Sequence, residues 1–168
     1  MSYDFSVDEI FEMAEQIERN GARFYRKMAD NISDKSIREL LLDFASMEDG
    51  HERVFASMRA DLSDKEREPR VFDPEDEAAL YLRALADLRV FNEKAEDGFV
   101  LPEDLPEIEK GIRVFREAIK QEKDSIVFYL GMKELVPENY GREKIDSIIQ
   151  EEMKHIRLLS NKLASLKA

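Results

Sequence analysis

The sequence contains no cysteine and no tryptophan, and its 168 residues include only six glycines, five prolines and two histidines. The absence of cysteine excludes disulfides, thiolate metal sites, thiol nucleophiles and iron–sulfur clusters. Any redox-active metal would therefore be held by oxygen and nitrogen. No apolar run approaches the roughly 20 residues of a membrane span, and the first residues lack the basic and apolar regions of a signal peptide. We therefore expect a cytoplasmic protein with no membrane partner.

Acidic residues outnumber basic ones by 38 to 26, which gives a formal net charge of −12. Such a chain repels nucleic acid and anionic membrane surfaces, so we expect neither as a partner, and its field attracts cations instead. With 43% hydrophobic and 38% charged residues, the composition is typical of a helical protein with solvated outer faces. The length predicts a single domain over residues 1–168.

Apolar residues recur with helical spacing in five segments, which predicts an all-α fold. We expect an antiparallel four-helix bundle of two helical hairpins, the first over residues of about 6–60 and the second over about 106–166. Ser6 and Glu9 have the spacing of a capping box at the start of the first helix. The long crossover, about 61–105, is expected to hold an additional helix from about Pro74 to Asn92. Its apolar face would cover the bundle or a second subunit, so we expect a homodimer or a higher homo-oligomer.

The two predicted hairpins repeat each other at a fixed offset of 104 positions, without a gap. Eleven identities fall within 43 aligned positions, and they include glutamates, histidines and tyrosines as well as apolar residues. The identical pairs include Phe11/Phe115, Glu18/Glu122, Tyr25/Tyr129, Glu48/Glu152 and His51/His155. The chain is therefore interpreted as a duplicated helical hairpin.

Both histidines lie three residues after a glutamate, His51 after Glu48 and His155 after Glu152. Residues three apart on an α-helix share a face, so one turn can present a carboxylate and an imidazole to the same ion. A further glutamate precedes each pair by the same 30 positions. Six candidate metal ligands result, enough for two ions: Glu18, Glu48, His51, Glu122, Glu152 and His155.

These glutamates occupy core positions in their helices, because each interrupts a stripe of apolar residues. All four lie 15 residues from the nearer predicted turn, at Ser33 or Pro137, which places them at one level, roughly 22 Å from the turns. Buried carboxylates without counter-charge repel one another, so they must take up protons or bind cations. Two divalent ions would neutralise four carboxylates, and this donor set suits iron or manganese, with iron preferred on general availability.

Tyr25 and Tyr129 each lie seven residues, or two helical turns, after one of the lone glutamates. Each phenol could donate a hydrogen bond to a ligand carboxylate of the other hairpin and so tune the site. The alternative is that both rings are core aromatics whose hydroxyls bond to the backbone.

With these ligands the sequence resembles the ferritin-like di-iron carboxylate proteins and, within them, rubrerythrin-type domains. That pattern is a lone Glu from each of two helices and a Glu-x-x-His from each of the other two. Rubrerythrins typically carry one more glutamate, where this chain has Ser125, and a four-cysteine rubredoxin domain, which is missing here. The six-ligand set is similar to that of bacterioferritin, but Asp49 stands where a haem-ligating methionine would be expected. The resemblance therefore implies two iron ions, with manganese or a mixed pair as alternatives, and no haem.

The function that this resemblance implies is a rubrerythrin-like oxidoreductase that reacts Fe(II) with hydrogen peroxide or O2 in oxidative-stress defence. An external rubredoxin-like donor would supply electrons. One alternative is a ferroxidase that stores or delivers iron. Another is a binding or scaffold protein whose metals only brace the bundle. Manganese catalase-like chemistry is a third.

Overall fold

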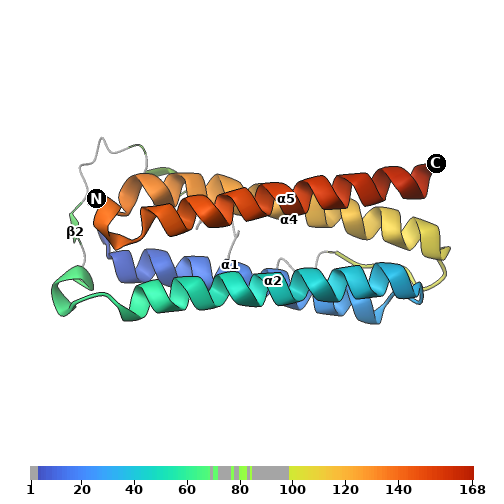
Figure 1. Ribbon diagram of the computed structural model, residues 1–168, viewed down its shortest axis with the longest axis horizontal. Helices are drawn as coiled ribbons and strands as arrows, with labels where there is room; N and C mark the ends of the chain where they lie inside the picture. Colours follow the sequence, from blue (N-terminus) through green and yellow to red (C-terminus); the bar gives the residue numbers. More distant parts are fainter. Residues whose placement is uncertain (1–3, 69, 72–76, 78–79, 83, 85–98) are drawn as a thin grey trace.

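The computed structural model describes residues 4–68, 70–71, 77, 80–82, 84 and 99–168. Four long helices lie side by side along an elongated bundle (Figure 1). They are α1 (Val7–Asp30), α2 (Lys35–Ala60), α4 (Glu107–Leu135) and α5 (Arg142–Lys167). The helices of the two hairpins thus span residues 7–60 and 107–167, against the predicted ranges of about 6–60 and 106–166.

Local sequence signals explain where the helices begin. The hydroxyl of Ser6 accepts a hydrogen bond from the Glu9 amide at 3.1 Å, and the Glu9 carboxylate accepts one from the Ser6 amide at 2.8 Å. This is the capping box expected from the sequence. Asp34 caps α2 by accepting a hydrogen bond from the Ile37 amide at 2.9 Å. Before α5 the chain turns at Gly141, whose φ of 95° lies in the left-handed region that glycine tolerates.

The short elements lie between the helices. Two short 3-10 helices, η1 (Asp64–Glu66) and η3 (Glu138–Tyr140), follow α2 and α4. One antiparallel pairing of two-residue strands, β1 (Asp4–Phe5) with β2 (Arg70–Val71), was not predicted. It ties the start of the chain to the beginning of the crossover.

Most of the crossover helix predicted from Pro74 to Asn92 lies outside the described residues. Residues 77, 80–82 and 84 are described, and they are helical. Leu82 is fully buried, and the Tyr81 hydroxyl donates a hydrogen bond to the Val127 carbonyl at 2.9 Å. This part of the crossover therefore packs against α4.

The helices pack in pairs, α1 along α2 and α4 along α5, while α1 faces α4 and α2 faces α5 across the bundle. The buried apolar residues form two clusters. One includes Phe11, Phe55 and Phe128, and the other includes Phe44 and Phe115. Within each long helix the two clusters are contributed by opposite halves, so the middle of the bundle lies between them. Among the described residues, no helix is both long and apolar enough to cross a membrane.

Candidate metal centre

The middle of the bundle is polar, and every long helix contributes to it. Glu18 comes from α1, the Glu48/His51 pair from α2, Glu122 from α4 and the Glu152/His155 pair from α5. All six side chains are buried, with at most 4% of any residue exposed. The structure thus brings together all six candidate ligands, at the junction of the two apolar clusters.

The six residues form two overlapping groups of four. Glu18 and His51 belong to one group, Glu122 and His155 to the other, and Glu48 and Glu152 belong to both. Within each group the potential ligand atoms lie within 4.8 Å of one another. Two ions bound here would lie at adjacent positions, each with its own carboxylate and imidazole, and both would share the carboxylates of Glu48 and Glu152.

The individual distances show how Glu152 is shared. Its Oε1 lies 2.9 Å from Nδ1 of His51, and its Oε2 lies 2.9 Å from Nδ1 of His155. Glu48 divides its oxygens in the same way, with Oε2 3.7 Å from His51 Nδ1 and Oε1 3.3 Å from His155 Nδ1. The unshared carboxylates are close to one imidazole each, Glu18 to His51 at 3.4 Å and Glu122 to His155 at 3.6 Å.

Several of these atoms are buried and have no hydrogen-bond partner among the described residues. They are Oε2 of Glu18, Oε1 of Glu48, both carboxylate oxygens of Glu152, and Nδ1 of both histidines. Leaving even one such group unsatisfied costs about 1–3 kcal/mol, and these atoms face one another. Two divalent cations would satisfy them all, because carboxylate oxygen and neutral imidazole nitrogen are suitable ligands for iron or manganese. The residues present therefore fit a di-metal centre.

The electrostatics of the site lead to the same inference. Burial raises the pKa of Glu18 and of Glu122 well above the usual range, and the Glu48 and Glu152 carboxylates raise both further. Burial alone would lower the pKa of His155, but contacts with three surrounding glutamates outweigh burial and raise this pKa to about 12. Without a cation, the site therefore retains protons that isolated side chains would lose. Bound metal ions would take the place of those protons.

Each hairpin also contributes a tyrosine that reaches the lone glutamate of the other. Tyr25 on α1 donates a hydrogen bond to Oε1 of Glu122, and Tyr129 on α4 donates one to Oε1 of Glu18. Burial and the nearby carboxylates raise the pKa of both phenols, so both remain protonated donors. The Tyr25 ring stacks on Phe44 with centroids 5.2 Å apart, which fixes its direction.

Sequence reasoning missed one residue at the edge of the site. Glu151, on α5, accepts a hydrogen bond from Nε2 of His51 at 2.8 Å, across the gap between α5 and α2. Its side chain is 49% exposed. The internal repeat gave no signal for it, because the residue 104 positions earlier is Met47.

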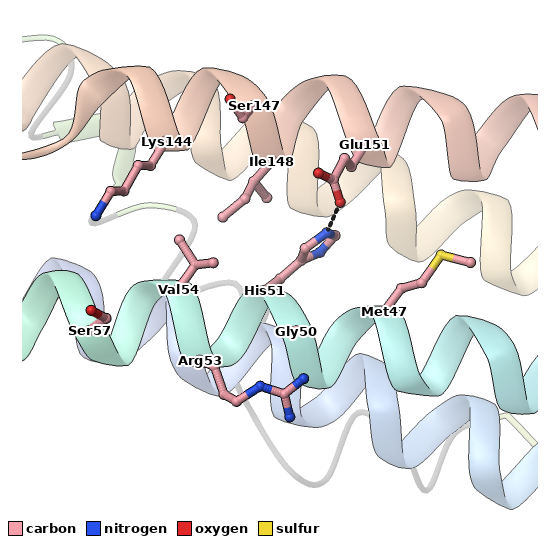
Figure 2. A pocket seen from close by; sticks show the side chains of 10 residues that line it. All are labelled: Met47, Gly50, His51, Arg53, Val54, Ser57, Lys144, Ser147, Ile148 and Glu151. Carbon is pink, nitrogen blue, oxygen red and sulfur yellow. Dashed lines mark hydrogen bonds and ion pairs between the residues drawn. The ribbon is translucent and has the colours of Figure 1, made fainter.

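A surface pocket of about 690 Å³ lies directly over this contact, between α2 and α5. Met47, Val54 and Ile148 give it apolar walls. Figure 2 shows Glu151 extending from α5 to meet His51 within the lining of the pocket. This pocket lies between solvent and one edge of the metal centre.

Ser125 stands where rubrerythrin-type domains typically carry an additional glutamate, and it does not extend the ligand set. Its hydroxyl donates a hydrogen bond to the Gln121 carbonyl of its own helix at 3.1 Å. The buried ligand set around the two positions thus remains four glutamates and two histidines.

Two antiparallel helical hairpins that enclose lone glutamates and Glu-x-x-His pairs define a ferritin-like di-metal carboxylate bundle. The chain belongs to the rubrerythrin family, whose model, described as Rubrerythrin, matches residues 9–163. It is also similar in structure to a candidate ferritin-like diiron-carboxylate protein from Thermotoga maritima, with a TM-score of 0.71 and 24% sequence identity over 98% of each chain. No curated protein sequence matches the chain.

Proposed function

We propose that the protein is a non-haem di-iron oxidoreductase that reduces hydrogen peroxide or O2 in oxidative-stress defence. The observation that supports this best is the pair of buried four-residue groups that share Glu48 and Glu152. Two adjacent ions held this way would supply two electrons at one place, as the conversion of H2O2 and two protons to two waters requires. Family membership favours iron, and the same donor set would accept manganese.

The chain's own residues have three roles in this proposal. Glu18 and His51 would hold one ion, Glu122 and His155 the other, and the two shared glutamates would bind both. The tyrosine hydroxyls keep a proton at Oη beside the unshared carboxylates and so fix the direction of these carboxylates. The apolar clusters on either side limit the access of water along the axis of the bundle.

Sustained turnover needs electrons from outside the chain. The sequence has no cysteine and therefore no iron–sulfur centre of its own. We propose that a separate rubredoxin-like protein supplies them. The cytoplasmic location and the homo-oligomeric state expected from the sequence remain predictions.

The test is to load the protein with Fe(II) under anaerobic conditions and then mix it with equimolar H2O2 or with O2 in a stopped-flow spectrophotometer. The proposal predicts rapid oxidation of two Fe(II) per chain, faster with peroxide. A Glu152→Ala variant serves as the control for iron bound elsewhere. Rapid oxidation by O2 with continued uptake of many irons into a large assembly would instead support ferritin-type storage. No reaction with either oxidant would support a metal that only braces the bundle.

A further inference from the structure

The duplicated centre is not symmetric at its outer edge. Nε2 of His51 lies 2.8 Å from Oε2 of Glu151, a residue of the other hairpin. The position related to Glu151 by the repeat is Met47, whose thioether is only a weak hydrogen-bond acceptor. The two halves of the duplicated site therefore have identical candidate ligands, but the residues available to accept a hydrogen bond from the two histidines differ.

The contact with Glu151 fixes which nitrogen of His51 faces the ions. Nδ1 of His51 points toward the carboxylates of Glu18, Glu48 and Glu152. With a metal bound on that side Nδ1 carries no proton, so Nε2 carries it and donates to Glu151. A carboxylate on this N–H holds the ring direction and tautomer and increases electron donation to the metal.

His155 is held differently. Within the described part of the chain, no hydrogen bond reaches its Nε2. Its ring is positioned by packing instead, edge-on against Phe44 with centroids 5.0 Å apart and stacked on His51 at 5.6 Å. Ring packing restrains orientation, but it supplies no charge to the nitrogen that faces the metal.

Glu151 is available for this role because nothing else in the described structure competes for it. Lys144 and Arg53 line the same pocket (Figure 2), yet among the described residues neither forms an ion pair with Glu151. The carboxylate is half-exposed, and its one described partner is His51.

We propose that Glu151 is a positioning residue that makes the two metal positions unequal, so that the position held by Glu18 and His51 binds its ion more tightly than the position held by Glu122 and His155. This inference rests on the di-metal site of the proposed function. The position held by Glu18 and His51 would therefore bind the first ion, although both positions have ligands of the same types.

The test is a calorimetric titration of the metal-free, full-length protein with Co(II), which also reports coordination through its visible absorption. Wild-type protein should bind two Co(II) in two separable steps. Glu151→Ala should weaken the tighter step by about ten-fold, as removal of such a partner typically does, and leave the weaker step unchanged. Glu151→Gln keeps a hydrogen-bond acceptor but no charge, so its affinity at the tighter step should lie between those of wild type and Glu151→Ala.

Glu143→Gln is the matched control, because it removes one exposed carboxylate from the same helix, two turns before Glu151. It should leave both steps unchanged. Thermal unfolding of each metal-free variant should match that of wild type, which separates a change at the ion from general damage to the fold.

The possible results distinguish this inference from the proposed function. If wild-type protein binds two ions and Glu151→Ala leaves both binding steps unaffected, the role of Glu151 is overturned and the di-metal site stays intact. The same holds if Glu151→Ala weakens both steps equally. Fewer than two ions bound to wild-type protein would overturn the di-metal site and this inference with it.

Discussion

Tyr129 on α4 donates a hydrogen bond to Glu18 on α1, and the same relationship recurs between Tyr25 and Glu122. Each hairpin thus contributes the donor that orients the lone glutamate of the other. The two hairpins therefore depend on each other for the geometry of the site, which explains why the repeat conserves tyrosine at both positions within the chain.

Replacing either tyrosine by phenylalanine removes this donor and should weaken the binding of one of the two metal ions by about ten-fold. The reason is that the ligand glutamate loses both its direction and a hydrogen bond to its charged form. Metal titration of Tyr25→Phe and Tyr129→Phe measures the effect. Tyr140→Phe is the control, since the Tyr140 hydroxyl donates to Glu66, away from the site. If all three variants bind metal equally well, the tyrosines are only core aromatics.

The shared and unshared glutamates should respond differently to mutation. Glu152→Ala removes a ligand from both positions, so we expect it to abolish tight binding of both ions, whereas Glu18→Ala should leave one ion bound. Equilibrium dialysis against Mn(II), followed by metal analysis, gives the number of ions per chain. Circular dichroism confirms that each variant is folded. If the two variants lose the same number of bound ions per chain, a bridging role for Glu152 is contradicted.

Substitution of Gly131 tests the contact between the crossover and α4. A Cβ at this position would lie 2.6 Å from Cε1 of Tyr81, so Gly131→Ala should reduce the free energy of unfolding by about 1–3 kcal/mol, despite the better helix propensity of alanine. At Gly50 the nearest atom is Nη2 of Arg53 at 3.9 Å, and Gly50→Ala should instead stabilise by about 1 kcal/mol. Urea unfolding of the metal-free variants measures both. If both substitutions change the free energy of unfolding in the same direction, the packing described for Tyr81 against α4 is contradicted.

The ion pair between Asp8 and Arg59 links α1 to α2 and should make stability depend on pH. Asp8 accepts hydrogen bonds from Nε and Nη2 of Arg59 at 3.0 and 2.9 Å, and chiefly for this reason its pKa is held below the usual 3.8. A carboxyl whose pKa falls on folding stabilises the protein above its unfolded pKa, and this contribution is lost as the pH falls through its folded pKa. Asp8→Asn should therefore cost about 1 kcal/mol at neutral pH, and this cost should shrink progressively as the pH falls below the usual Asp pKa of 3.8.

Urea unfolding at neutral pH and at a series of lower pH values measures this loss. Asp43→Asn is the control, because Asp43 is exposed on α2 and has no ion pair in the described structure. A pH-independent cost for Asp8→Asn would mean that the asparagine disturbs packing and that the ion pair contributes little.

The sequence was sufficient to predict the four long helices and the six candidate ligands, for a physical reason. Helical periodicity and the Glu-x-x-His spacing are local, and the 104-residue repeat places equivalent side chains at one level without knowledge of the packing. Glu151 could not be found this way. Its contact with His51 joins two helices across a pocket, and the distance between them follows from packing and is not visible in any spacing along the chain. The β1–β2 pairing is two residues long on each side, too short to produce an alternating pattern.

The proposed function requires that Glu48 and Glu152 be shared by two metal ions at the middle of the bundle. Anomalous X-ray diffraction from crystals of the full chain loaded with Fe(II) or Mn(II) tests this most directly. We expect two anomalous peaks per chain, one beside Glu18 and His51 and the other beside Glu122 and His155, with both shared carboxylates contacting both peaks. A single peak, or peaks bound only by surface carboxylates, would contradict the shared di-metal site.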